Sequence, residues 1–168
     1  MNISTSIPGC RIRCATVADC QLILDFVKEL ADYEKLSHQV VATRETLAET
    51  LFGEQAYAEV LIGEFEHSPV GYALFFHNFS TFTGRPGIYL EDIYVNPASR
   101  GKGFGKSLLA YIAKLAVERH CTRVEWSVLD WNEPSIQFYR SIGAMPMQGW
   151  TVQRLDGTAL DSFAKEFR

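Results

Sequence analysis

The spacing of apolar residues along the chain predicts its helices. In residues 16–33, five apolar side chains recur at helical spacing, and Thr16 with Asp19 forms a capping-box-like start. Thr43 is expected to cap a second helix that Gly53 terminates. A long helix with an apolar stripe follows a glycine-rich loop. The predicted helices are residues 16–33, 43–51, a long helix ending near 120, 132–141, and a last turn or two from 158.

Alternating and continuous apolar runs predict the strands. They are residues 11–15, 57–65, 70–76, 88–95 and 124–129, with two short strands or a hairpin within 144–156. Residues 77–86, rich in aromatic, Ser/Thr and Gly residues, are expected to form a loop. Residues 1–10 are expected to be a frayed N-terminus, so the chain is predicted to be a single domain over 11–168.

A glycine-rich loop joins strand 88–95 to the long helix. Gly101, Gly103 and Gly105 place a residue without a Cβ at every second position. Such a loop exposes backbone N–H groups at the positive end of the helix dipole, which favours a phosphate group. A P-loop would need a glycine at the position of Arg100, and a dinucleotide fingerprint would need G-x-G-x-x-G, so the loop matches neither motif. The simpler interpretation is a glycine turn that caps the helix.

Composition narrows the classes of function. The chain has 168 residues, 47% of them hydrophobic, and a formal net charge of −4. This charge argues against binding of nucleic acid or a membrane surface and suits a cationic substrate. The four cysteines form no C-x-x-C pair and no Cys/His cluster with zinc spacing, and no apolar run reaches the length of a membrane span. We therefore expect reduced thiols, no metal site and a cytoplasmic location.

Two acidic residues interrupt the apolar strand 88–95. Glu91 and Asp92 are adjacent, and a carboxylate in an apolar strand is usually exposed, paired or functional. Strand alternation would send the two side chains to opposite faces, so they share a site only if a bulge redirects one of them. The simpler interpretation is one solvent-facing acid and one acid paired with a nearby Lys or Arg.

A second cluster of polar and aromatic residues covers positions 130–144. Asn132 is followed seven residues later by Tyr139 and then by the pair Gly143-Ala144. Tyr139 alone has a simpler interpretation as a core aromatic on an amphipathic helix.

Three segments together resemble the GNAT acetyltransferases. RGKGFG (100–105) fits the pattern [Arg/Gln]-x-x-Gly-x-[Gly/Ala] of that family's pyrophosphate loop. YLED (89–92) and DWNEPSIQFY (130–139) are more specific and are similar to the diamine acetyltransferases, a group that comprises the spermidine/spermine and thialysine N-acetyltransferases. The similarity covers residues 11–156. It implies the GNAT fold, an α/β (α+β) architecture with a mixed, mostly antiparallel central sheet flanked by helices on both faces.

The resemblance also implies two binding sites and a homodimer. One site holds acetyl-CoA as acetyl donor; its expected residues are Ile93, Tyr94, Val95, Arg100, Gly101, Lys102, Gly103, Phe104, Gly105, Lys106, Asn132 and Tyr139. The other holds a small cationic amine; its expected residues are Tyr33, Glu34, Phe82, Glu91, Asp92 and Trp150. An acidic site with aromatic walls suits a polycation through charge pairing and cation–π contacts.

The implied reaction assigns roles to two residues. A free alkylamine titrates near 10.4, so only roughly one molecule in a thousand is nucleophilic at pH 7. A carboxylate such as Glu91 attracts the cation and accepts its proton, directly or through a water. Backbone N–H groups of residues 93–95 stabilise the oxyanion. Tyr139 supplies the proton for the leaving thiolate, because a tyrosine with a pKa of about 10 is protonated at neutral pH. Neither a metal nor a covalent intermediate is needed.

Several alternatives stay open at the level of sequence. Phe82 stands where the polyamine enzymes tend to carry Trp, and MPMQG (145–149) is shorter and less acidic than their segment, so lysine-like acceptors compete with spermidine. Glu34 is equally well explained as a solvated residue at a helix end, and Trp150 as a packing residue. The acceptor is alternatively an amino acid or a peptide amine. A non-catalytic CoA-binding module is disfavoured by the presence of Tyr139.

Overall fold

The computed structural model describes residues 2–167, and the chain divides into two compact units, Met1–Leu129 and Asp130–Arg168. The first unit carries the sheet and the glycine-rich loop. The second carries two helices and the segment between them.

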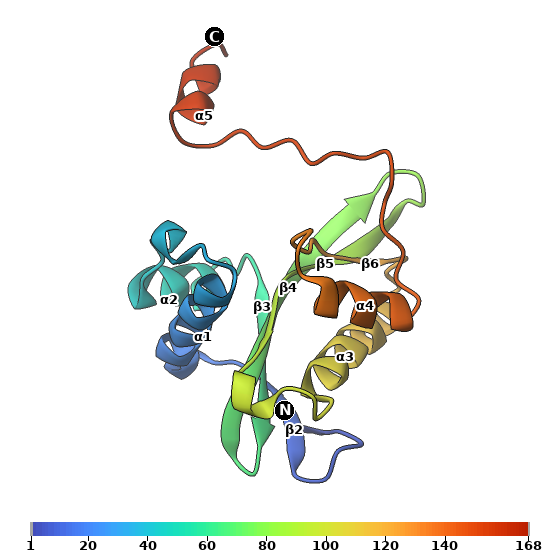
Figure 1. Cartoon of the computed structure of the whole chain (residues 1–168). Coiled ribbons are helices and arrows are strands. Elements are labelled where there is room, and N and C mark those ends of the chain that lie inside the picture. The colour runs from blue at the N-terminus through green and yellow to red at the C-terminus, as the bar shows by residue number, and fades with distance from the viewer. Residues whose placement is uncertain (1, 168) are drawn as a thin grey trace. The chain divides into compact units, whose positions relative to one another are not determined.

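Six strands form one sheet in the first unit, and they follow one another in chain order across it (Figure 1). They are β1 (Asn2–Ser4), β2 (Cys10–Cys14), β3 (Glu59–Phe65), β4 (Ser68–Ser80), β5 (Arg85–Val95) and β6 (Val124–Glu125). The neighbouring pairs from β1 to β5 are antiparallel, whereas β5 and β6 are parallel. The predicted mixed, mostly antiparallel sheet is confirmed.

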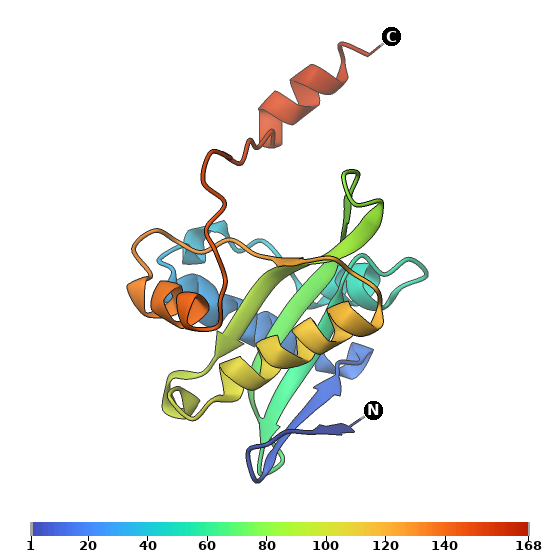
Figure 2. The same ribbon diagram turned by 90° about the vertical axis from the view of Figure 1, so that its right-hand side faces the viewer.

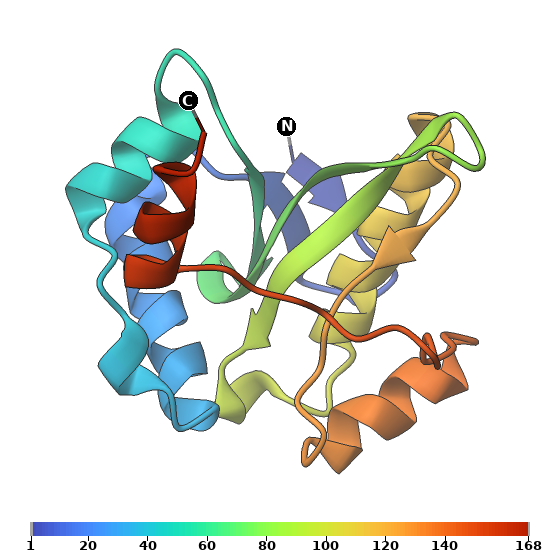
Figure 3. The same cartoon turned by 90° about the horizontal axis from the view of Figure 1, so that it is seen from above.

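Helices cover both faces of this sheet (Figures 1 and 3). The helical segments of the first unit are η1 (Val17–Asp19), α1 (Cys20–Tyr33), η2 (Ser37–Gln39), α2 (Arg44–Phe52), η3 (Pro97–Ser99) and α3 (Phe104–Glu118). The predicted caps are present: the backbone N–H of Thr16 donates to Asp19 at 2.8 Å, and that of Thr46 donates to Thr43 Oγ1 at 3.2 Å. Local sequence therefore sets where η1, which leads directly into α1, and α2 begin.

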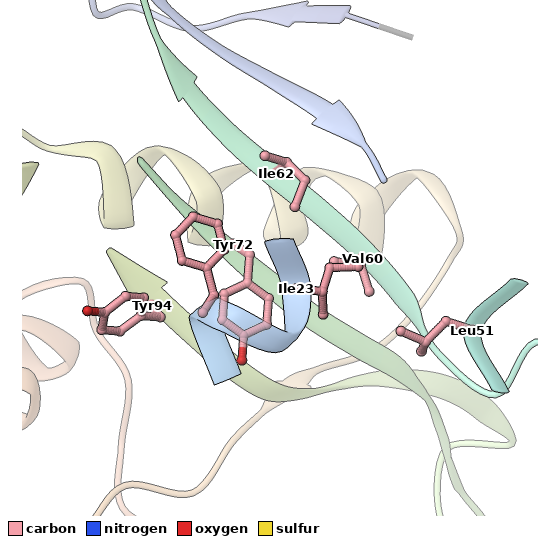
Figure 4. Close-up of a cluster of buried hydrophobic side chains, with 7 residues drawn as sticks. Ile23, Leu51, Val60, Ile62, Tyr72 and Tyr94 are labelled. Atoms are coloured by element: carbon pink, nitrogen blue, oxygen red, sulfur yellow. The ribbon is translucent and has the colours of Figure 1, made fainter. Parts of the chain in front are cut away.

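One part of the core lies between α1, α2 and the middle of the sheet (Figure 4). It consists of Ile23, Phe26, Leu51, Val60, Ile62, Tyr72 and Tyr94. On the other face, α3 packs so closely that a Cβ at Gly63 of β3 would lie 3.6 Å from Leu108 Cδ1. The sheet is thus buried on both sides, and a polar side chain that faces α1 enters a mainly apolar layer.

The sheet extends further than the sequence pattern predicted. The expected loop 77–86 is mostly strand, because β4 continues to Ser80 and β5 already begins at Arg85, so that the two strands form one long hairpin (Figure 2). The expected frayed N-terminus instead contains β1, whose residues pair with β2. Conversely, strand 124–129 is shorter than predicted, because β6 comprises only Val124–Glu125.

The second unit contains α4 (Glu133–Ser141) and α5 (Gly157–Ala164). Both helices were expected, but the strands predicted within 144–156 are wrong, because that segment is irregular. Pro146 has no N–H for a ladder, and Gly149 adopts a φ of 85°, which interrupts an extended backbone.

Residues 2–167 contain neither a helix of the length and apolar character that a bilayer span requires nor a group of three or more His, Cys, Asp or Glu side chains placed to hold a metal ion. All four cysteines are free thiols.

Candidate active site

A β-bulge in β5 places the two adjacent acids. Leu90 pairs with Phe75 of β4, whereas Asp92 pairs with Leu74, so Glu91 is an extra residue without a cross-strand partner position. Because successive residues of β4 point to opposite faces, Leu90 and Asp92 also do so although they are two positions apart. The bulge that the sequence analysis required to redirect one of the two acidic side chains is therefore present. It puts Asp92 on the face of the sheet that packs against α1.

Asp92 is bonded to a tyrosine that sequence reasoning missed. The Tyr72 hydroxyl donates a hydrogen bond of 2.8 Å to Asp92 Oδ2, and Tyr72 is completely buried in the core. Burial raises the pKa of the Asp92 carboxyl, and the hydrogen bond from Tyr72 partly opposes this shift. In the sequence Tyr72 resembled any strand aromatic, and its only signal was its place in a strand next to the one that carries the acids.

Glu34 joins this cluster from the end of α1, where it is the C-cap residue. Burial raises the pKa of Glu34, and the negative charge of Asp92 raises it further. The pKa of Tyr72 lies far above its usual value, first because the hydroxyl is buried and then because of the charges of Asp92, Glu34 and Glu91. A negative side chain at a helix C-terminus also opposes the helix dipole. We call Glu34, Glu91 and Asp92 the acid cluster; its members repel one another and would attract a cation.

Arg100 connects the glycine-rich loop to the end of α1. Its guanidinium carbon lies 4.6 Å from the ring centroid of Tyr33 and 5.5 Å from that of Tyr94, and its Nε donates to the carbonyl of Val95 at 2.9 Å. Tyr33 immediately precedes Glu34. The loop predicted to bind the donor and the helix end predicted to bind the acceptor are thus joined by one side chain.

The outer edge of β5 is open beyond the bulge. β5 pairs with β6 only at Ile88 and Tyr89, and no other described strand pairs with that edge. The N–H of Asn96 donates to Val70 of β4 at 2.9 Å. Because backbone groups alternate in direction along a strand, the N–H groups of Ile93 and Val95 point away from β4, towards this open edge.

The loop after β5 has the backbone that its glycines permit. Gly101 and Gly103 adopt φ values of 75° and 88°, which favour glycine strongly, and Gly103 is the N-cap of α3. Gly105 has no such φ, and a Cβ there would make only an ordinary contact of 3.7 Å with Val95. The fold alone therefore does not require glycine at position 105, but a ligand that approaches the start of α3 closely would. Lys102 and Lys106 are exposed beside the loop, and Phe104 is buried beneath it.

Three predicted site residues belong to the second unit. Asn132 is the N-cap of α4 and is buried, and Tyr139 lies two turns further along the same helix face. The Tyr139 ring packs against that of Phe138 at a centroid distance of 5.4 Å. Trp150 lies in the irregular segment and is 77% exposed. Their expected roles beside the thioester and the amine stay predictions.

Phe82 is not brought to the acid cluster within the first unit. It lies in the turn of the β4–β5 hairpin and is 95% exposed. The strand pair Ser80–Arg85 is six residues along β4 from the pair Leu74–Asp92, a separation of roughly 20 Å at the rise of a strand. Because the hairpin is longer than predicted, its tip lies far from the bulge along the strands, and the expected role of Phe82 stays a prediction.

Known proteins resemble this chain over most of its length. Residues 25–144 match the profile of the Acetyltransferase (GNAT) family. The thialysine N-epsilon-acetyltransferase of Mus musculus is 38% identical over 165 residues, which covers 92% of this chain and 96% of that protein. The L-ornithine N5-acetyltransferase of Arabidopsis thaliana is 33% identical over 200 residues, which covers 92% and 88% of the two chains.

The fold is likewise found in solved structures. A mobile-metagenome integron cassette protein of V. cholerae superposes with a TM-score of 0.79 at 25% identity, covering 94% of this chain and 98% of that one. Profile, relatives and architecture agree with one another and with the resemblance of the loop and the YLED segment. The chain belongs to the GNAT family of acetyltransferases and is an N-acetyltransferase related to the thialysine and diamine enzymes.

Proposed function

We propose that this enzyme transfers the acetyl group of acetyl-CoA to a primary amine of a small acceptor that carries a second positive charge. This class contains lysine-like amino acids and di- or polyamines. The observation that carries the proposal is the acid cluster. Asp92 accepts a hydrogen bond from the buried hydroxyl of Tyr72, and the charges of Asp92, Glu34 and Glu91 all raise the pKa of that hydroxyl. Two ammonium groups would relieve the mutual repulsion of these carboxylates better than one.

The donor site fits a pyrophosphate. When bound, acetyl-CoA supplies an acetyl group activated as a thioester. The N–H groups at the start of α3, opened by Gly101 and Gly103, would hold its phosphates, with Lys102 and Lys106 exposed nearby. The outward-pointing N–H groups of Ile93 and Val95 in β5 precede this loop in the chain, and they would stabilise the developing oxyanion.

The acceptor must lose a proton before its nitrogen becomes a nucleophile. Glu91 is the exposed member of the acid cluster and lies at the bulge, beside the open edge of β5, so we assign it as the base, acting directly or through a water. Glu34 and Asp92 would hold the cationic acceptor. Tyr139 donates a proton to the sulfur that leaves; this role rests on its spacing from Asn132 and on the family.

A thiol-release assay with acetyl-CoA tests the acceptor class. Thialysine, lysine, ornithine, putrescine, spermidine and spermine each carry at least two amines, and butylamine serves as a singly charged control of similar length to putrescine. We expect kcat/KM for the best dication to exceed that for butylamine at least tenfold. The reason is that binding of the second ammonium group by carboxylates should by itself raise kcat/KM at least tenfold. Equal turnover of butylamine and putrescine, with no better acceptor in the panel, would contradict the proposal.

The same assay tests the assignment of Tyr139 as the proton donor. Tyr139→Phe should lower kcat at least tenfold and leave the affinity for CoA unchanged, since only the proton donor is lost. A variant that binds CoA normally and retains full activity would remove Tyr139 from this role. A wild-type chain that is stabilised by acetyl-CoA but turns over no amine would instead be the CoA-binding module. The homodimer and the cytoplasmic location stay predictions.

A further inference from the structure

Tyr72 has a feature that packing alone does not explain. Its ring is completely buried and is stacked on Phe26, with ring centroids 5.6 Å apart and planes inclined by 4° (Figure 4 shows its place in the cluster). A phenylalanine ring would fill this space equally well. A buried hydroxyl costs free energy unless it is hydrogen-bonded, so the tyrosine requires a partner.

That partner is the acid cluster. The hydroxyl donates to Asp92 Oδ2 at 2.8 Å, across the pair of neighbouring strands β4 and β5. A carboxylate has two oxygens, and this bond uses one lone pair of one of them. Because Tyr72 is held rigidly by the stacked ring and the strand, it also fixes the rotamer of the Asp92 side chain.

We propose that Tyr72 is a positioning residue of the acceptor site: its hydroxyl holds Asp92 so that the second oxygen of Asp92, together with the carboxylate of Glu34, forms a fork for an ammonium group of the acceptor. This inference rests on the proposed function, because it needs a cationic acceptor. Tyr72 itself touches no substrate. It acts through Asp92, and its removal should affect binding of the acceptor more than the chemical step.

The hydrogen bond also has a consequence for pH. Glu34 at the end of α1 and Tyr72 of β4 interact with Asp92, and the charge of Glu91 acts on the same Tyr72 hydroxyl. Tyr94 lies two residues further along β5 on the same face, where Glu29 of α1 and Arg100 interact with it. Burial raises the pKa of Asp92, and the bond from Tyr72 lowers it. Loss of the hydroxyl therefore raises this pKa further, and the acidic limb of kcat/KM for the acceptor should move to higher pH.

The test is Tyr72→Phe, which keeps the stacked ring. With the best dication of the panel, KM should rise about tenfold, kcat should change less than about threefold, and the acidic limb should move upward. Tyr57→Phe is the control, because it removes a hydroxyl from a 65% exposed ring. In the Asp92→Asn background, Tyr72→Phe should change KM less than about twofold, since the two residues act as one unit.

Each other outcome contradicts the inference. An unchanged KM and pH profile in Tyr72→Phe would mean that the hydroxyl does not position Asp92, and an equal loss in the Asp92→Asn background would mean that it acts elsewhere. A Tyr72→Phe chain that does not fold would show that the hydroxyl serves the core. The proposed function is judged separately, by whether the wild-type enzyme prefers dications in the same assay.

Discussion

Two groups of acidic residues lie at the two ends of helix α1, and they differ in how their charge is balanced. At the N-terminus, Asp19 accepts two hydrogen bonds of 2.8 Å from Arg13, whose Nε donates to Glu64 at 2.7 Å. Arg13 lowers the pKa of Asp19. At the C-terminus, burial and the charge of Asp92 raise the pKa of Glu34.

Under the proposed function, the difference separates acids that stabilise the fold from acids that would bind the cationic acceptor. The first group contains its own cation, and Asp19 sits at the positive end of the helix dipole. The second gathers like charges at the negative end of the same helix, where the protein gains nothing in stability from them. In the proposed function, the cationic acceptor would supply the missing charge.

The largest expected effect comes from neutralising the second group. Glu34→Gln with Asp92→Asn should lower kcat/KM for a dicationic acceptor on the order of a thousandfold, because two charged contacts to the acceptor are lost. Steady-state kinetics with the amine panel measures this. Asp25→Asn with Glu45→Gln removes the same charge from exposed positions of α1 and α2 and is the matched control. A comparable loss in the control would mean that overall charge, not this cluster, attracts the amine.

Removing the internal cation of the first group should affect stability instead. Arg13→Met leaves the carboxylates of Asp19 and Glu64, which are 13% and 17% exposed, without their ion pairs. The free energy of unfolding should fall by about 3 kcal/mol, as measured in urea, while the folded variant keeps its acceptor KM. Arg11→Met, an exposed position of the same strand, should change stability by less than about 0.5 kcal/mol. An increase in the KM for the amine in Arg13→Met would contradict the distinction between the two groups of acids.

The pH dependence of stability should have opposite signs at the two ends. The folded-state pKa of Asp19 is lowered, so its stabilisation is present above the unfolded value near 4 and is lost as the pH falls below it. The folded-state pKa of Asp92 is raised, so its contribution is favourable below about 4 and is lost as the pH rises through the raised value.

Single substitutions should therefore separate the two acids at neutral pH. Asp19→Asn should lower the free energy of unfolding at pH 7, and Asp92→Asn should raise it by about 1 kcal/mol, a gain in stability at the expense of activity. Both differences should shrink towards pH 3. Urea unfolding across this range measures them, and a destabilised Asp92→Asn protein would show that Asp92 serves the fold.

Local sequence was sufficient for features that depend on a few neighbouring residues. The caps at Thr16 and Thr43 need only a polar side chain at the right distance from free backbone N–H groups. The loop before α3 needs residues that tolerate a positive φ, and Gly101 and Gly103 provide them. Asn132 and Tyr139 were identified by their resemblance to the family's motif, and their spacing of seven residues, two helical turns, places them on one face of α4.

Long-range pairing decided the rest. The sequence by itself showed Glu91 next to Asp92, but only the register of β4 against β5 inserts the extra residue that turns Asp92 towards α1. Glu34 and Tyr72 are distant from Asp92 in the chain. The pairing of β4 with β5 brings Tyr72 to Asp92, and the packing of α1 on the sheet brings Glu34 near it. The length of the β4–β5 hairpin, which removes Phe82 from this cluster, was likewise invisible, because polar and aromatic residues on an extended edge have no local pattern that distinguishes them from a loop. Local rules thus determined the helix starts and the backbone of the glycine-rich loop, and tertiary packing determined the extent of the strands and which acids lie together.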